Sequence, residues 1–505
     1  MAHLDGSSLT LAQLVAVADG RDEAALAAAV LQRIDGARTV VEQHAQGDEP
    51  VYGVNTGFGA LAETRIAKDA LDQLQVNLLR SHAAGVGEPL PVRAVRATMA
   101  LRANVLAKGF SGIRLETLQR LLDLLNRRVH PIVPSRGSVG ASGDLAPLAH
   151  LALVLIGEGE ARIGDGPVLS GRQALAAAGL QPLRLRAKEG LALINGTQPS
   201  TAVGALALEG AHRLARAADI ALALSVDALR GSVHPFDARI HAARPHAGQG
   251  VSAANVTRLL EGSAINKSHE ACGRVQDAYS LRCAAQVHGA ARDALAFAAG
   301  LLLTEANSAT DNPMVFADNG EIVSGGNFHG APVAIAADVL AIALVQLATI
   351  SERRADRLVN PALSDLPAFL TEDSGLQSGY MMAQVTAAAL ASELKTLAHP
   401  ASADTIPTSA NREDHVSMSM GAALKAERAL ALATRVIAIE ILCACQAIDL
   451  LAPLTTSPPL AAVHARVRSL VPPLAGDRPP APDIEQIAAL IADGALESAC
   501  AGEVK

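Results

Sequence analysis

Aromatic residues are scarce in this chain. It has no tryptophan, and its 505 residues include three tyrosines and seven phenylalanines. Half of all residues are hydrophobic, so the chain can bury a large core, but that core must be mainly aliphatic. Two of the three tyrosines, Tyr52 and Tyr279, lie in polar stretches. An aromatic side chain in such a setting is a candidate for a functional role.

Cysteine is also scarce. The five cysteines, Cys272, Cys283, Cys443, Cys445 and Cys500, are too few and too irregularly spaced for a disulfide framework. Two of them are only two residues apart in a helical pattern, which places them on different faces and makes them a poor metal pair. We therefore expect a reduced, cytoplasmic setting.

The chain lacks the patterns of several protein classes. Its net charge is −8 with both signs interspersed, so no basic face for nucleic acid is expected. The N-terminal residues do not show the basic-then-apolar pattern of a signal peptide. The apolar run 331–350 contains Asp338 and Gln346, which favours a buried core helix over a membrane span. No P-loop, dinucleotide motif or zinc spacing is present, so we expect no metal and no external cofactor.

Helical periodicity dominates the chain. Apolar spacing predicts long helices over about 201–229, 284–304, 331–358, 379–397 and 421–450. Several are apolar nearly all round, which indicates burial among other helices. The region before them mixes shorter helices with turns and a short β-hairpin within 155–190. The predicted fold class is mainly α: an elongated bundle of long helices with a smaller mixed N-terminal region.

Three regions follow from this pattern. We expect a mixed N-terminal region over 1–200, a central long-helix bundle over 201–470, and a proline-rich connector with a last helix over 471–505. Polar segments interrupt the helices, and loops of this kind are where function is expected. These segments are 52–59, 137–144, 194–198, 274–283, 324–330 and 407–417.

The most unusual segment is GSVGASGDLAPLAH, residues 137–150. Gly143 has no Cβ, so its amide nitrogen can closely approach the carbonyl carbon of Ala141. Attack at that carbon, with dehydration of Ser142 to a methylidene, would make a five-membered electrophilic ring. The alternative is a helix N-terminus capped by Ser142 or Asp144, and the segment taken alone favours that alternative.

The segment 137–150 resembles the signature of the aromatic amino acid ammonia-lyase family, whose electrophile is methylidene-imidazolone (MIO). The resemblance extends through most of the chain, in motifs that follow in the family's order. These are YGVNTGFG (52–59), LLRSHAAGVG (78–87), NGTQ (195–198), QDAYSLRC (276–283), DNPMVF (311–316), SGGNFH (324–329), QVTAAALASE (384–393) and NREDHVSM (411–418).

The resemblance implies a fumarase/aspartase-like helical fold. It also implies a homotetramer whose active sites are shared between subunits. MIO would form from Ala141, Ser142 and Gly143 near the positive ends of helices, which favour developing negative charge. The reaction implied is loss of ammonia from an amino acid substrate: the amine adds to the electrophile, a base removes a β-proton, and an α,β-unsaturated acid is released.

The family's motifs assign roles to further residues. Tyr52, as tyrosinate, matches the base; the alternative is a turn tyrosine with its hydroxyl in water. Arg282 would bind the substrate carboxylate as a bidentate fork, unless it makes only a surface ion pair. Tyr279 lies on the same face as Arg282 if the segment is helical, and would line the amine or MIO. Gln276 would add a polar contact on that face.

Two more side chains complete this set. Asn195 would hydrogen-bond the MIO oxygen or the substrate. A left-handed Asn in an Asn-Gly turn is the alternative, and both can hold together. Phe328 would form a flat apolar wall, unless it only packs in the core.

His82 and Glu413 indicate the substrate. Both resemble the histidine branch of the family, and an acidic acceptor beside an apolar ring would be left unpaired at a cost of about 1–3 kcal/mol. We therefore predict L-histidine as substrate, with trans-urocanate and ammonia as products. The alternatives are a core histidine at position 82 and a helix-start cluster at Glu413, Asp414 and His415.

Some positions depart from the histidine branch and leave other functions open. Arg136 resembles the phenylalanine and tyrosine branch, Ala278 stands where proline is common, and Arg412 stands where glutamine is usual and can pair with Glu413. A phenylalanine, tyrosine or promiscuous aromatic lyase therefore remains an alternative. A 2,3-aminomutase and a catalytically inactive helical scaffold are the others.

Overall fold

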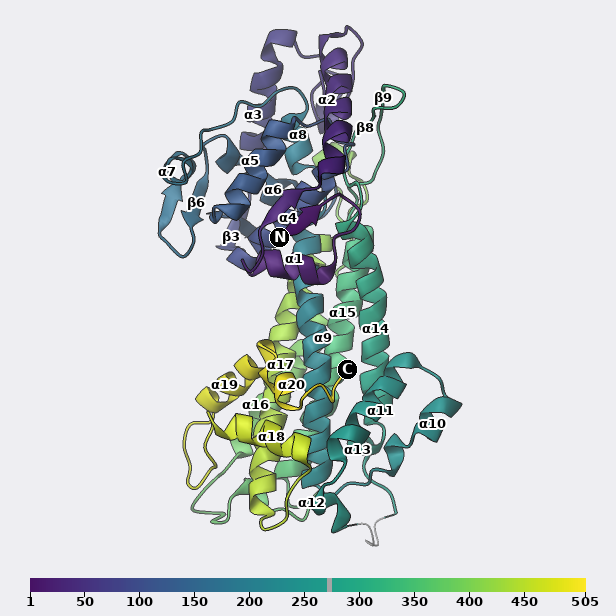
Figure 1. Ribbon diagram of the computed structural model, residues 1–505, viewed down its shortest axis with the longest axis vertical. Coiled ribbons are helices and arrows are strands. Elements are labelled where there is room, and N and C mark those ends of the chain that lie inside the picture. Colours follow the sequence, from purple (N-terminus) through teal and green to yellow (C-terminus); the bar gives the residue numbers. More distant parts are fainter. Residues whose placement is uncertain (270–274) are drawn as a thin grey trace. The chain divides into compact units, whose positions relative to one another are not determined.

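The computed structural model describes residues 1–269 and 275–505 (Figure 1), so Cys272 lies outside the described residues. The structure is mainly helical, as predicted. The chain folds into two compact units. Unit 1 consists of 1–206, 299–338 and 400–424, and unit 2 of 207–298, 339–399 and 425–505. Both draw on separate stretches of sequence, whereas the regions 1–200, 201–470 and 471–505 stay a prediction.

Unit 1 contains a set of short and medium helices. They are α1 (Leu11–Ala18), α2 (Leu31–Gln46), α3 (Leu71–His82), α4 (Val92–Ala107), α5 (Leu115–Asn126), α6 (Leu145–Leu155), α7 (Gly171–Ala177) and α8 (Glu189–Ile194). Short 3₁₀ turns accompany them at η1 (Ala28–Val30), η2 (Gly59–Leu61), η3 (Lys68–Ala70) and η6 (Ser409–Asn411). In α4, every residue from Ala94 to Ala107 is buried, and the helix packs against α1 and α5.

All strands of the described chain are short and lie in unit 1. They are β1 (Ala2–Leu4), β2 (Ala24–Leu26), β3 (Val86–Pro89), β4 (Val129–Pro131), β5 (Pro134–Arg136), β6 (Glu160–Ile163), β7 (Val168–Ser170), β8 (Met314–Phe316) and β9 (Glu321–Val323). The β1–β2 pair is parallel, and the other pairs are antiparallel. In the β6–β7 hairpin, which the sequence predicts within 155–190, Glu160 pairs with Ser170.

Four long helices contribute residues to both units. They are α9 (Gln198–Ala228), α14 (Ala284–Ala306), α15 (Ala331–Val359) and α17 (Ser419–Leu450). Their bounds agree with the predicted helices within a few residues. The remaining helices of unit 2 are α10 (Ala238–Ala243), α11 (Ala247–Leu260), α12 (Ala264–Lys267), α13 (Tyr279–Arg282), α16 (Met381–Leu397), α18 (Pro458–Arg468), α19 (Ala481–Ala492) and α20 (Ala495–Ala499). Two 3₁₀ turns, η4 (His234–Phe236) and η5 (Ala368–Leu370), complete it.

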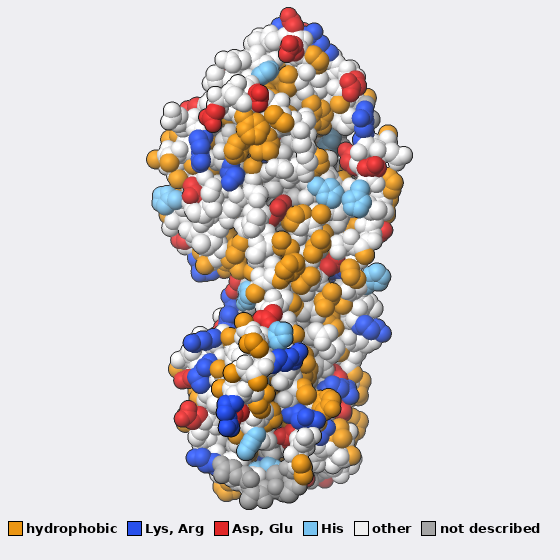
Figure 2. Space-filling model, turned by 90° about the vertical axis from the view of Figure 1, so that its right-hand side faces the viewer, with side chains coloured by type: hydrophobic (Ala, Val, Ile, Leu, Met, Phe, Trp, Pro, Cys, Tyr) orange, Lys and Arg blue, Asp and Glu red, His pale blue; other side chains and the backbone are white. Residues whose placement is uncertain are grey.

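By length and composition, α15 and α17 could each cross a membrane. However, 67% of the most apolar window of α15 and 78% of that of α17 is buried within the protein. This burial agrees with the prediction of a core helix over 331–350. Unit 2 also exposes large hydrophobic side chains, among them Phe297, Ile342, Met382 and Val385. Figure 2 shows such side chains in patches among charged ones on one face.

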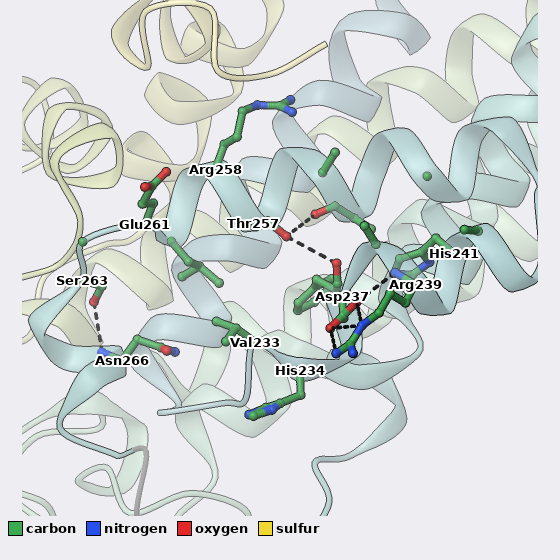
Figure 3. A pocket seen from close by; sticks show the side chains of 18 of the residues that line it. Val233, His234, Asp237, Arg239, His241, Thr257, Arg258, Glu261, Ser263 and Asn266 are labelled. Atoms are coloured by element: carbon green, nitrogen blue, oxygen red, sulfur yellow. Dashed lines mark hydrogen bonds and ion pairs between the residues drawn. The ribbon is translucent and has the colours of Figure 1, made fainter.

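Unit 2 contains a pocket of about 1040 Å³, lined by residues of η4, α10, α11 and α12 (Figure 3). Arg239 on its wall is already paired with Asp237 at 2.6 Å. Thr257 Oγ1 donates to the carbonyls of Ala253 and Phe236 at 3.0 and 3.4 Å. Among the described residues that line this pocket, none is one that the sequence predicts for the site.

Candidate active site

The predicted site residues fall into two groups. Unit 1 contains Tyr52, His82, Ala141, Ser142, Gly143, Asn195, Phe328 and Glu413. Unit 2 contains Gln276, Tyr279 and Arg282. Each group is described within its own unit.

The segment 137–143 forms a loop between β5 and α6, and its last residue lies directly against a second glycine. Gly143 has a left-handed φ of +70° and forms a parallel bridge with Gly196. The Asp144 amide donates to the Gly196 carbonyl at 2.8 Å. A Cβ on Gly143 would lie 2.3 Å from that same carbonyl oxygen. Only glycine fits here, because the backbone conformation and the close approach both exclude a side chain.

Asp144 anchors the end of this loop. Its fully buried carboxylate accepts from Ser138 Oγ at 2.7 Å and from the Ser200 amide, in the first turn of α9, at 2.8 Å. Burial raises the pKa of Asp144, although both hydrogen bonds lower it. Its side chain makes no capping hydrogen bond to α6. The alternative of a simple cap of α6 by Asp144 is therefore wrong.

Helix N-termini surround the loop. α6 begins directly after it, and α9 begins two residues after Gly196. The Met418 amide, just before α17, donates to the Val139 carbonyl at 2.7 Å. The Gly330 amide, just before α15, donates to the Gly140 carbonyl at 3.3 Å. Unpaired amides and helix dipoles make such termini positive, so the loop lies where developing negative charge is favoured.

Glu413 approaches Ser142. Ser142 Oγ lies 3.5 Å from Glu413 Oε1, at the limit of a hydrogen bond. The other oxygen, Oε2, is buried and has no hydrogen-bond partner among the described residues. Arg412 is exposed, and within the described ranges no ion pair joins it to Glu413. Glu413 precedes α17 by six residues and forms a bridge with Thr408, so it is not part of a helix-start cluster.

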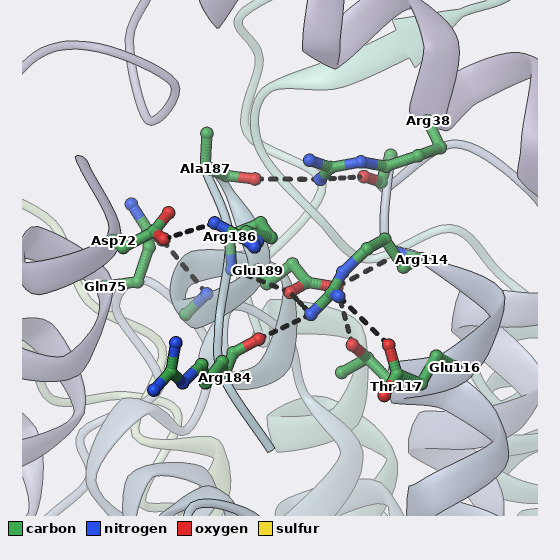
Figure 4. A network of polar contacts seen from close by, with 12 residues as sticks. Arg38, Asp72, Gln75, Arg114, Glu116, Thr117, Arg184, Arg186, Ala187 and Glu189 are labelled. Carbon is green, nitrogen blue, oxygen red and sulfur yellow. Dashed lines mark hydrogen bonds and ion pairs between the residues drawn. The ribbon is translucent and has the colours of Figure 1, made fainter. Parts of the chain in front are cut away.

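Asn195 follows the short helix α8, which is held at its start by a buried carboxylate. Glu189 accepts from Arg114 Nη2 at 2.7 Å, from Thr117 Oγ1 at 2.6 Å and from the Arg186 amide at 2.8 Å (Figure 4). The side-chain oxygen of Gln75 accepts from the Gly190 amide at 3.0 Å. These contacts fix the first turn of α8.

At the other end of α8, Asn195 has φ −87° and ψ 102°, so the alternative of a left-handed Asn is wrong. The positive φ of +157° belongs to Gly196 instead. Asn195 Oδ1 is buried and has no partner within the described chain. An unsatisfied buried oxygen is costly, so this atom is available to accept a hydrogen bond from a ligand.

Arg102 holds the same segment from behind. It projects from α4 and is completely buried. Its Nη1 donates to the Asn195 carbonyl at 2.8 Å and to Gln198 Oε1 at 2.6 Å, and its Nη2 donates to the Ala192 carbonyl. Burial lowers the pKa of Arg102 to about 10, and Asp311 opposes this shift. The guanidinium therefore stays charged at neutral pH.

Tyr52 lies in the loop 51–57 and is half-buried, with its ring edge-on to Phe58 at 6.4 Å. Burial raises the pKa of Tyr52, and the charges of Glu413 and Asp311 raise it further, while hydrogen bonding to the Gly59 backbone lowers it. The hydroxyl is therefore protonated at neutral pH, and it becomes a strong base once it loses its proton.

His82 ends α3 and is half-buried. Its Nδ1 lies 2.9 Å from the Leu78 carbonyl, which fixes the ring and leaves Nε2 free for another partner. Burial lowers the pKa of His82, so the neutral ring is favoured. Phe328 is half-buried in the loop before α15.

In unit 2, the Arg282 guanidinium stacks over the Tyr279 ring at 4.5 Å. This contact confirms that the two residues share a face, because α13 spans Tyr279–Arg282. Arg282 Nε is buried without a hydrogen-bond partner in the described part of the chain. Gln276 is exposed and precedes α13, so its predicted place on the same helical face is wrong.

The residues around Ala141–Gly143 fit an MIO group. Gly143 lies directly against Gly196 with no room for a side chain. Glycine permits the close approach of Gly143 N to a carbonyl carbon that ring closure needs. Among the described residues, no cluster of His, Cys, Asp or Glu could hold a metal ion.

Sequence reasoning missed Arg102, the anchoring role of Asp144, and the buried ion pair of Lys188 and Asp311, whose Nζ–Oδ2 distance is 3.1 Å. A signal was present for Arg102, since it is a charge within the apolar run MALRANVLA. A charged residue on the buried face of a core helix needs polar partners.

Comparison with known proteins gives three kinds of match. The sequence profile of the family described as aromatic amino acid lyase matches residues 9–469. Histidine ammonia-lyase from Gloeobacter violaceus is 57% identical over 502 residues, which cover 98% of this chain and 98% of that protein.

Two solved structures are similar over nearly the whole chain. Histidine ammonia-lyase from Trypanosoma cruzi has a TM-score of 0.93 and 46% identity, covering 100% of this chain and 96% of that one. Tyrosine aminomutase from Streptomyces globisporus has a TM-score of 0.94 and 41% identity, covering 100% and 99%. A lyase and a mutase therefore match this fold about equally well.

Proposed function

This chain belongs to the aromatic amino acid lyase family, and we propose that it is a histidine ammonia-lyase that converts L-histidine to trans-urocanate and ammonia. The observation that carries the choice of substrate is the free oxygen of Glu413. Its Oε2 is buried without a partner in the described chain, beside Ser142. An imidazole N–H can satisfy this oxygen, whereas a phenyl ring would leave it unpaired at a cost of about 1–3 kcal/mol.

We assign MIO formation to Ala141, Ser142 and Gly143. Once formed, this group supplies an electrophilic carbon for the substrate amine. Tyr52 must first lose its hydroxyl proton, and the resulting tyrosinate then removes the β-proton of the substrate. Glu413 and His82 hold the imidazole: Glu413 Oε2 is buried without a partner in the described structure, and the contact of His82 Nδ1 with the Leu78 carbonyl leaves Nε2 for the substrate. Asn195 donates from its side-chain amide nitrogen to the ring oxygen, or its Oδ1 accepts from the substrate, and Phe328 forms a wall.

The residues of unit 2 complete the proposed site. Arg282 binds the substrate carboxylate, Tyr279 lines the amine, and Gln276 adds a polar contact. In the tetramer we propose, different copies of the chain supply the two groups. The exposed hydrophobic side chains of unit 2 support such an assembly, because a soluble monomer rarely exposes many large ones. A cytoplasmic location remains a prediction.

The test is product analysis with L-histidine, L-phenylalanine and L-tyrosine, with the Ser142→Ala protein as blank. We expect near-ultraviolet absorbance of urocanate and free ammonia with histidine only. Cinnamate from phenylalanine would make the enzyme an aromatic lyase of another specificity. A β-amino acid in place of ammonia would make it an aminomutase. No product at all from any substrate would favour an inactive scaffold.

A further inference from the structure

We propose that Arg102 is a positioning residue for formation of the MIO ring: it holds the Asn195–Gly196 backbone rigid while Ala141, Ser142 and Gly143 close against it. This inference rests on the proposed function, because it requires that the ring forms. Arg102 does not touch the three residues that cyclise, and acts through Gly196.

The contacts of Arg102 converge on one short segment. All three of its acceptors lie within seven residues: the carbonyls of Ala192 and Asn195 and the side chain of Gln198. Gln198 in turn donates to Thr310 Oγ1 at 2.6 Å. One guanidinium therefore joins the end of α8 to the start of α9, across the residues between them.

Gly196 is enclosed between Arg102 and the loop. A Cβ on Gly196 would lie 2.5 Å from Arg102 Nη1 and 2.4 Å from Gln198 Oε1. On the loop side, Gly196 bridges Gly143, and its carbonyl accepts from the Asp144 amide at 2.8 Å. A shorter side chain at position 102 would leave space beside Gly196. Gly196 could then shift toward α4, and its close contact with Gly143 would be lost.

Arg102 differs from a buried arginine that is paired with a carboxylate. Within the described chain, Arg102 forms no ion pair with a carboxylate, and its Nε has no partner. Arg354 in unit 2 is also fully buried, but it is paired with Glu440 at 2.8 Å. A buried charge without an opposite partner is costly, and apolar side chains of similar size often pack at least as well. What sets Arg102 apart from Arg96, which is also buried and bound to carbonyls, is that its acceptors flank Gly196.

The covalent step needs no outside reagent. The Gly143 nitrogen lone pair bonds to the Ala141 carbonyl carbon. The Ala141 oxygen leaves as water with the amide hydrogens of Gly143 and Ser142, and a double bond forms between the Ala141 carbon and the Ser142 nitrogen. Ser142 Oγ leaves as a second water with its own hydrogen and the Cα hydrogen, which gives the methylidene. Ring closure depends on how closely the nitrogen is held to the carbon, and a misplacement of about 1 Å can cost about a hundredfold in rate.

The experiment compares Arg102→Lys with Arg96→Lys in the full-length protein. Arg96 is a matched control, because it lies on the same helix, is buried, and donates to the carbonyls of Val17, Ala18 and Leu125. Each protein is weighed intact, and its Ser142 peptide is weighed after trypsin digestion. Urea unfolding is measured in parallel.

We expect wild type and Arg96→Lys to lack the mass of two waters, and Arg102→Lys to be folded but to close the ring about a hundredfold more slowly. A merely structural role would lower the unfolding midpoint of both variants and leave both dehydrated. An Arg102→Lys protein that loses both waters as fast as wild type, when mass is followed over time after in vitro translation, would therefore overturn the inference. A wild-type protein of unmodified mass would overturn the MIO assignment as well, whereas a dehydrated wild type without activity on histidine would overturn only the substrate.

A second pair of variants decides the case if Arg102→Lys does not fold. Gln198→Leu removes one acceptor of Arg102, and Gln198→Glu keeps it. We expect slower dehydration in Gln198→Leu than in Gln198→Glu when mass is followed over time after in vitro translation. Equal rates would contradict the role of Arg102.

Discussion

Asp144 in unit 1 and Asp219 in unit 2 are both completely buried, yet their pKa values move in opposite directions. Burial raises the pKa of Asp144, whose partners are a hydroxyl and a backbone amide. Burial also acts on Asp219, but Arg292, His288 and Ser252 outweigh it and hold the pKa of that carboxyl well below its usual range. The difference lies in the kind of partner.

The same contrast extends to the neighbours of each aspartate. The two buried charges compared in unit 2 are paired with opposite charges: Asp219 with Arg292 at 2.6 Å, and Arg354 with Glu440. In unit 1, Arg102 holds backbone carbonyls. Paired side chains fix helices to one another, whereas a side chain bound to carbonyls fixes the course of a loop. We therefore expect changes at the buried ion pairs of unit 2 to affect folding and changes around the loop of unit 1 to affect chemistry.

The largest expected effect is on catalysis, from Tyr52→Phe in unit 1. Removing the proposed base should lower kcat with histidine by about 10²–10⁴-fold. Urea unfolding should hardly change, because the ring stays in place. Steady-state kinetics and unfolding curves test this. A variant that loses stability and keeps its kcat would show that Tyr52 has only a structural role. Changes in the two units would then no longer differ in whether they affect catalysis or folding.

The next effect is on stability, from Arg354→Met in unit 2. Leaving Glu440 buried without its partner should cost about 3–5 kcal/mol in free energy of unfolding. The control is Arg435→Met, because Arg435 forms an exposed pair with Glu485 at 2.7 Å and such pairs contribute about 0–1 kcal/mol. Urea unfolding of both measures the difference. A similar loss of unfolding free energy in the two variants would contradict the expected difference between the buried and the exposed ion pair.

A smaller effect concerns specificity. Glu413→Gln should lower kcat/KM for histidine by about tenfold to a hundredfold, since it replaces a charged acceptor of an imidazole N–H by a neutral one. Activity on phenylalanine, if any, should not fall. Competition between the two substrates measures the ratio directly. An unchanged preference for histidine would place the recognition of the ring at another residue.

The sequence predicts the long helices of the fold better than it predicts the loops. Apolar periodicity predicts α9, α14, α15, α16 and α17 closely, because burial alone decides these helices. The order of motifs correctly predicts the family and the mainly helical fold, which are both confirmed. The residue roles within the site stay predictions.

The rest depends on tertiary contacts. Nothing local places Gly196 against Gly143, or Arg102 behind them, because these residues are far apart in sequence. The conformation of Asn195 and the exposed position of Gln276 also differ from expectation, since local patterns do not report where a helix begins.

The smallest expected effect is the pH dependence of stability. A pKa raised on folding means that the native state binds the proton more tightly, so the contribution of Asp144 to stability falls as pH rises through its raised pKa. For Asp219 the pKa is lowered, so its contribution is present above its unfolded pKa of about 3.9 and is lost below it.

Thermal unfolding between about pH 3 and 7 should therefore show a loss below about pH 4 that Asp219→Asn removes. It should also show a slight gain on mild acidification that Asp144→Asn removes. Identical pH profiles for the two variants would show that the two aspartates do not differ in the way described above.

The three tyrosines lie in three different environments. Tyr52 is half-buried, Tyr279 is 69% exposed, and Tyr380 is 1% exposed. With no tryptophan present, their emission is not masked by indole. A water-soluble quencher such as iodide should therefore reach Tyr279 first and Tyr380 last. Intrinsic fluorescence can then report ligand arrival at Tyr52 or Tyr279 without any added label.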